Sequence, residues 1–114
     1  MVNQSIAIIS QTEAIKIVKE YIKKVKALGV DVKKAFLFGS FARNHQTEWS
    51  DIDVALVGDD FVGFPLIDNT PFRRLHTTDE FMVIETHTFP TASLTNGDAF
   101  LNEVVLRTGI EINI

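Results

Sequence analysis

The chain has no cysteine, which excludes disulfide bonds and thiolate metal sites. It also has no apolar run close to the ~20 residues that cross a bilayer. Its first residues, 1–5, lack the basic region of a secretory signal. These absences lead us to expect a cytoplasmic protein with no membrane partner.

The chain also has fewer basic than acidic residues. Lysine and arginine number 11 against 15 aspartates and glutamates, which gives a formal net charge of −4. A wide nucleic-acid surface needs a basic stripe, so a nucleic-acid partner is not expected, and the basic residues 23–26 are interpreted as the solvated face of a helix. With 114 residues, of which 46% are hydrophobic, the chain suffices for one globular domain over residues 1–114.

Hydrophobic spacing predicts an α/β (α+β) domain with a short mixed sheet of three or four strands, covered by helices on one face. Ser10 and Glu13 form a capping-box pattern, and the apolar residues after them recur at helical spacing over residues 11–28. A second helix is expected at residues 98–107. Apolar runs predict strands at residues 30–38, 51–57, 81–89 and 110–114.

Two stretches are expected to be connections. Residues 41–50 are polar, and we expect one or two helical turns there, followed by a loop. Residues 59–79 contain Pro65 and Pro71 and show no clean period, which predicts a long connection with at most a short helix. Its apolar part, residues 61–67, is expected to be buried over the sheet, with a contact surface for another protein as the alternative.

The most informative motif joins a Gly-Ser turn to two aspartates. Gly39 and Ser40 end one apolar run, and Asp51 and Asp53 open the next after ten intervening residues. Residues two apart in a strand project from the same face, so the two carboxylates are predicted to lie side by side. The alternative, a pair that caps a turn, leaves two like charges to repel within an apolar strand. Paired acids beside a glycine-led turn favour binding of a divalent cation and a nucleoside triphosphate.

Residues 36–57 resemble the nucleotidyltransferase fold of the DNA polymerase β superfamily, and in particular its minimal nucleotidyltransferases. Their signature is Gly-Ser, a spacer, and Asp-x-Asp followed by aliphatic residues, and the motif described above stands at those positions. The resemblance extends to a bacterial subgroup of small single-domain members and covers roughly residues 30–114. Two positions depart from the family pattern. Asn44 replaces a glycine but still tolerates a left-handed turn, and Glu85 stands where the family often has a third aspartate.

The resemblance implies Mg²⁺-dependent transfer of a nucleoside monophosphate, with AMP from ATP as the expected reaction. Asp51 and Asp53 then bind the metal and serve catalysis, and Glu85 completes the metal site or acts as a base. The alternative for Glu85 is a solvated residue of an edge strand. The nucleotide-binding residues implied are Gly39, whose backbone approaches phosphate, Ser40, at the expected start of a helix, and Arg43, which otherwise forms a surface ion pair.

Other chemistry-bearing residues have less defined roles. His87 shares the face of Glu85 and is a metal ligand, a base or a structural residue. Trp49 is interpreted as a packing residue, with base stacking as the alternative. His45 and His76 lie in polar loops and receive no role.

The sequence leaves the acceptor open, because the chain has no room for an acceptor domain. A second copy of the chain or another subunit is expected to complete that site. The resemblance implies, as a partner, a helical HEPN-type toxin that the protein neutralises as an antitoxin. The rival hypothesis is a non-catalytic protein of the same fold that neutralises a partner by occlusion.

Overall fold

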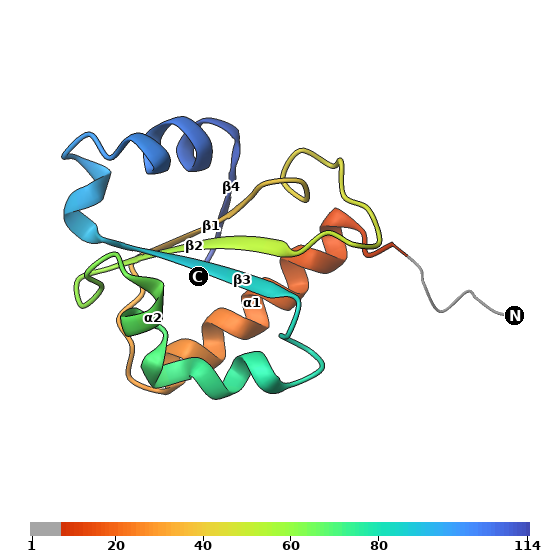
Figure 1. Ribbon diagram of the computed structural model, residues 1–114, viewed down its shortest axis with the longest axis horizontal. Helices are drawn as coiled ribbons and strands as arrows, with labels where there is room; N and C mark the ends of the chain where they lie inside the picture. Colours follow the sequence, from red (N-terminus) through yellow and green to blue (C-terminus); the bar gives the residue numbers. More distant parts are fainter. Residues whose placement is uncertain (1–7) are drawn as a thin grey trace, which may run out of the picture.

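The computed structural model describes residues 8–114, and its centre is a four-stranded sheet in the order β3-β2-β1-β4 (Figure 1). The strands are β1 (Lys34–Phe38), β2 (Ile52–Gly58), β3 (Ile84–Pro90) and β4 (Ile110–Ile112). Strand β1 runs antiparallel to β2 and β4, whereas β2 and β3 run parallel. The predicted mixed sheet within an α/β domain is therefore confirmed.

Helices fill most of the connections. They are α1 (Gln11–Ala27), α2 (Pro65–Asp68), the 3₁₀-helices η2 (Thr70–Thr77) and η3 (Thr91–Leu94), and the π-helix η4 (Leu101–Leu106). Helix α1 begins where the capping pattern predicts, and Ser10 Oγ accepts a hydrogen bond from the Glu13 amide at 3.0 Å. Within residues 8–114, none of the helices combines the length and the apolar character needed to cross a membrane.

The expectation of at most one short helix in residues 59–79 is wrong. Pro65 and Pro71 each lie in the first turn of a helix, α2 and η2 respectively. Proline is tolerated there because its missing N–H is one of the amides that a helix start leaves unpaired. The two prolines therefore start helices in this segment rather than interrupt them.

Both faces of the sheet carry apolar clusters. Figure 1 shows α1, α2 and η2 on one side of the sheet and the C-terminal helices on the other. The cluster on the α1 side includes Val18, Ile22, Leu37, Val54 and Leu56. The cluster on the opposite side includes Phe36, Phe38, Ala55, Val57, Phe89, Leu101 and Val105. Helices thus lie on a second face as well, where η4 covers part of the sheet.

The apolar segment at residues 61–67 is largely exposed, contrary to the expectation that it packs over the sheet. Phe61 is buried, but Phe64 and Ile67 are exposed and Leu66 is 83% exposed. The cause is the buried carboxylate of Asp68. It accepts hydrogen bonds from the amides of residues 62 and 63 at 3.0 and 2.9 Å and from the Thr88 hydroxyl at 2.6 Å. These bonds fold the loop back on β3, so its apolar side chains point outward.

A polar network crosses the core beneath the sheet. The Tyr21 hydroxyl lies 2.6 Å from His76 Nε2 and 2.7 Å from Thr86 Oγ1. Burial raises the pKa of Tyr21 and lowers the pKa of His76 below its ordinary value of 6.5. Both side chains therefore stay neutral at pH 7 in the folded protein.

We expect His76 to make the protein less stable as pH falls below 6.5, the ordinary pKa of histidine. Its folded pKa lies below its unfolded value, so the unfolded chain takes up the proton first. The stabilisation is complete above the unfolded pKa and is lost as pH falls toward the folded one. The pKa of Asp31 is lowered from 3.8, chiefly by the hydrogen bond from the Asp59 amide. Protonation of Asp31 therefore affects stability only at pH values below the range in which His76 titrates.

Urea denaturation at a series of pH values above and below 6.5 tests this prediction. His76→Gln should flatten the pH dependence of the free energy of unfolding. The variant His45→Gln, at an exposed histidine, should retain the dependence of the wild type. Equal pH dependence of the wild type and His76→Gln would contradict the prediction.

Candidate active site

The candidate site lies at the end of the sheet where the parallel strands β2 and β3 begin. The strand register places Asp53 directly opposite Glu85, and Phe38, the last residue of β1, opposite Asp53 from the other side. Alternate residues of a strand face opposite ways, so Asp53, Glu85 and His87 project from the face that η4 partly covers. Three segments distant in sequence therefore meet at one point.

The side chains of Asp53, Glu85 and His87 converge. Nε2 of His87 lies 3.4 Å from Glu85 Oε2 and 3.8 Å from Asp53 Oδ1. One ligand atom from each residue lies within 4.8 Å of the other two. The side chains of Asp53, His87 and Glu85 are 26%, 30% and 53% exposed, so the cluster is open to solvent on one side. Two carboxylate oxygens at this spacing are suitable donors for a divalent cation.

Gly39 packs directly against this cluster. Its φ of +74° is a left-handed conformation, and a Cβ added here would collide with the Asp53 carboxylate. Glycine is thus required on two independent grounds. Asn44 closes the turn with φ +57°, which confirms that it takes a left-handed conformation.

Residues 39–45 form a turn, and the expectation that Ser40 begins a helix is wrong. The His45 amide donates to the Ser40 carbonyl at 2.9 Å, and the Arg43 amide donates to the Gly39 carbonyl at 3.3 Å. The chain reverses at Asn44 before a helix forms. The turn offers backbone amides near Asp53 but no helix dipole.

Asp51 stands apart from the cluster. It is exposed, immediately before β2, and its carboxylate is not among the converging ligand atoms in residues 8–114. In the same described part of the chain, no lysine or arginine nitrogen lies within 4.0 Å of Asp51, Asp53 or Glu85. Their charges are therefore available to a cation. The metal-binding role of Asp51 stays a prediction.

Aromatic rings hold His87 in place. Its ring stacks on Phe100, with centroids 5.8 Å apart and planes inclined by 18°, and meets Phe38 edge to face at 5.0 Å. Phe100 precedes η4 and also stacks on Phe89. Phe100 lies in the helix that the sequence predicts at residues 98–107, but no sequence pattern indicates its contact with His87. The alternation of β3 puts residues 85, 87 and 89 on one face, and Phe100 stacks on the last two of them.

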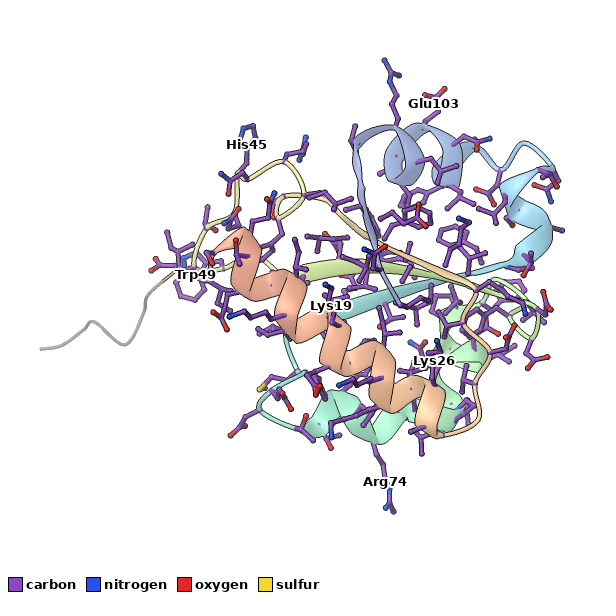
Figure 2. All side chains as sticks on the ribbon, turned by 180° about the vertical axis from the view of Figure 1, so that it is seen from behind. Lys19, Lys26, His45, Trp49, Arg74 and Glu103 are labelled. Atoms are coloured by element: carbon purple, nitrogen blue, oxygen red, sulfur yellow. The ribbon has the colours of Figure 1, made fainter. Side chains whose placement is uncertain are left out.

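Trp49 is 84% exposed, so the interpretation as a packing residue is wrong. The loop before β2 closes on its own polar groups. Ser50 Oγ accepts from the Thr47 amide at 2.9 Å, and Thr47 Oγ1 accepts from the Trp49 amide at 3.2 Å. These local bonds need no apolar contact, and Figure 2 shows Trp49 on the outside of the molecule, near the start of α1.

Comparison with known proteins gives the class. A family described as "Nucleotidyltransferase domain" matches residues 18–96, which contain the Gly-Ser turn, both aspartates of the motif and Glu85. The match covers more than half of the chain, and the chain therefore belongs to the nucleotidyltransferase domain family. The resemblance on which the sequence analysis rests is confirmed.

The proteins that are similar to the chain include one relative in sequence and one solved structure. One is the "Putative protein adenylyltransferase MJ0604" of Methanocaldococcus jannaschii, 47% identical over 45 residues, which are 39% of this chain and 45% of that protein. This alignment therefore spans less than half of the relative. The other is the crystal structure of "a putative nucleotidyltransferase from Sulfolobus solfataricus", with a TM-score of 0.62 and 18% identity over 89% of this chain and 80% of that chain. The second similarity is one of fold.

Proposed function

We propose that this protein is a Mg²⁺-dependent nucleotidyltransferase that moves AMP from ATP to an acceptor. The observation that carries the proposal is the register that places Asp53 opposite Glu85, with Gly39 packed on Asp53. Membership of the nucleotidyltransferase family supports the reaction class. The name of the Methanocaldococcus relative, an adenylyltransferase, supports AMP as the transferred group.

The carboxylates fit a divalent cation. Asp53 and Glu85 offer hard oxygen donors from adjacent strands, and no lysine or arginine in residues 8–114 pairs with them. Asp51, at the exposed edge, is proposed to add a further oxygen when substrate is bound. A bound Mg²⁺ would neutralise the charge that builds on the phosphoryl oxygens during transfer.

The turn is proposed to hold the triphosphate. Gly39 has no side chain, which leaves its backbone open to a phosphate oxygen beside the carboxylates. Ser40 contributes its hydroxyl, and the exposed Arg43 has the length and the charge to reach an anion. These three residues position the nucleotide, and the carboxylates act at its α-phosphate.

In the proposed reaction an acceptor hydroxyl attacks the α-phosphorus of ATP, and the bond to the bridging oxygen of pyrophosphate breaks. The proton of the attacking hydroxyl must pass to a base. Glu85 is the most exposed of the three converging side chains, which suits contact with an acceptor. It therefore completes the metal site or accepts this proton.

The acceptor is proposed to be a protein, and specifically a helical HEPN-type toxin for which this chain is the antitoxin. The resemblance to minimal nucleotidyltransferases motivates this choice. The exposed apolar side chains at residues 62–67 are a candidate contact surface. A second copy of the chain is the other candidate for completing the acceptor site. A non-catalytic protein that acts by occlusion stays the rival function.

Incubation with Mg²⁺ and ATP radiolabelled on the α-phosphate, with and without the HEPN-type candidate partner, tests the proposal. We expect label on the partner or on the protein itself, and about 100-fold less label with Asp51→Asn, because the site loses a metal-binding charge. Asp79→Asn, which changes an exposed aspartate outside the site, should label like the wild type. Tight partner binding without transfer by the wild type would favour the rival.

A further inference from the structure

We propose that His87 is a metal ligand through Nε2, which makes the site a set of one nitrogen and two carboxylate oxygens that prefers Mn²⁺ to Mg²⁺. The inference rests on the proposed function in that it concerns the same site. It adds a residue that the family signature in this sequence does not include. Three features of the cluster support it: the distances between the ligand atoms, the aromatic contacts that fix the imidazole ring, and the type of the donor atoms.

The distances suit ligands that share an ion. Nε2 of His87 lies 3.4 Å from Glu85 and 3.8 Å from Asp53, both longer than the ~3.2 Å limit of an ordinary N–H···O hydrogen bond. In an octahedral site, the geometry that Mg²⁺ and Mn²⁺ prefer, metal bonds of ~2.1 Å place adjacent ligand atoms about 3.0 Å apart, which is closer than either of these two distances. The three atoms therefore have room for a cation between them.

The ring is held in the orientation that ligation needs. Phe100 covers one face of the imidazole and the edge contact with Phe38 sets its tilt, so rotation of the ring requires both contacts to break. Neighbouring groups that fix the imidazole orient it as a ligand. The edge that these rings leave free carries Nε2 toward Asp53 and Glu85.

The donor set determines the preference for the metal. Mg²⁺ takes oxygen ligands almost exclusively and retains its water, whereas an imidazole nitrogen favours first-row transition metals. A site of two carboxylates alone discriminates little between Mg²⁺ and Mn²⁺. Adding His87 should raise the affinity for Mn²⁺ more than the affinity for Mg²⁺. An imidazolium that only pairs with the two carboxylates is the competing arrangement.

Titration of the full chain with Mn²⁺ alone, followed by the electron paramagnetic resonance signal of the free ion, tests the proposal. The wild type should bind Mn²⁺, and His87→Gln should bind it at least about 10-fold more weakly, because a ligand is lost. His45→Gln, at an exposed histidine outside the cluster, should bind like the wild type. Competition with Mg²⁺ should show a smaller ratio of Mn²⁺ affinity to Mg²⁺ affinity in His87→Gln than in the wild type.

A second measurement needs no variant. Electron spin echo modulation of bound Mn²⁺ should show coupling to a histidine nitrogen in the wild type, and the coupling should change when histidine is labelled with nitrogen-15. Absence of nitrogen coupling, no binding of Mn²⁺ by the wild type, or equal Mn²⁺ affinity of the wild type and His87→Gln would overturn the proposal.

The two proposals fail in different ways. Nitrogen coupling without AMP transfer would contradict the transferase and leave the ligand assignment intact. AMP transfer with a site that shows no nitrogen coupling would contradict the role of His87 and leave the transferase intact.

Discussion

Replacement of Asp53 by asparagine should lower the rate of the proposed AMP transfer by about 1,000-fold and leave the fold intact. Asparagine keeps the shape of the side chain but loses the charge and one of the two acceptor oxygens. A bound cation contributes several kcal/mol to stabilising charge in a transition state, and about 4 kcal/mol corresponds to this factor. The effect is measured as transfer of label from ATP under saturating Mg²⁺.

The same substitution should slightly stabilise the protein when no divalent cation is present. Asp53 and Glu85 stand side by side on adjacent parallel strands, and two negative charges at such close range repel each other. A residue whose removal lowers activity and raises stability has the signature of a binding site. Asp79→Asn, at an exposed aspartate, should change neither property. Retention of transfer within about tenfold by Asp53→Asn would refute the role of this carboxylate.

Replacement of Asp68 by alanine should lower the free energy of unfolding by about 3 kcal/mol. The buried carboxylate accepts from two backbone amides and the Thr88 hydroxyl, and its removal leaves these donors without partners. Urea denaturation with an unchanged slope would show that the loss is one of stability and not of cooperativity.

A graded set of variants separates hydrogen bonding from side-chain volume at this position. Asp68→Asn keeps one acceptor and the approximate volume, so its loss should be about 1 kcal/mol. Thr88→Val removes a single donor and should also cost about 1 kcal/mol. If Asp68→Ala were as stable as the wild type, the loop at residues 62–63 would not depend on this carboxylate.

Local patterns in the sequence predicted the elements well. The capping residue Ser10 and the helical spacing after it predicted α1 with its first residue correct and its last residue off by one. Both signals are local in the sequence. The alternation in β2 and the glycine before the spacer gave the motif, and Asn44 adopts the left-handed turn expected of it. Single-residue geometry of this kind does not depend on the rest of the fold.

Long-range contacts were not predictable in the same way. No local signal states that β3 pairs parallel with β2, and this register alone puts Glu85 opposite Asp53 and brings His87 beside both. The roles of Pro65 and Pro71 depended on whether helices started at them, which the aperiodic sequence around them did not reveal. The exposure of Trp49 follows from a loop that satisfies its own polar groups.

Because Trp49 is exposed, the intrinsic fluorescence of the chain should respond to contacts of its loop more than to unfolding. Trp49 is the sole tryptophan, so all indole emission comes from one loop two residues before Asp51. Unfolding adds little water around a ring that is already hydrated, and the signal is thus a weak indicator of denaturation. Contact of another molecule with that loop dehydrates the indole, which gives the protein an intrinsic, label-free indicator of occupancy at this end of the sheet.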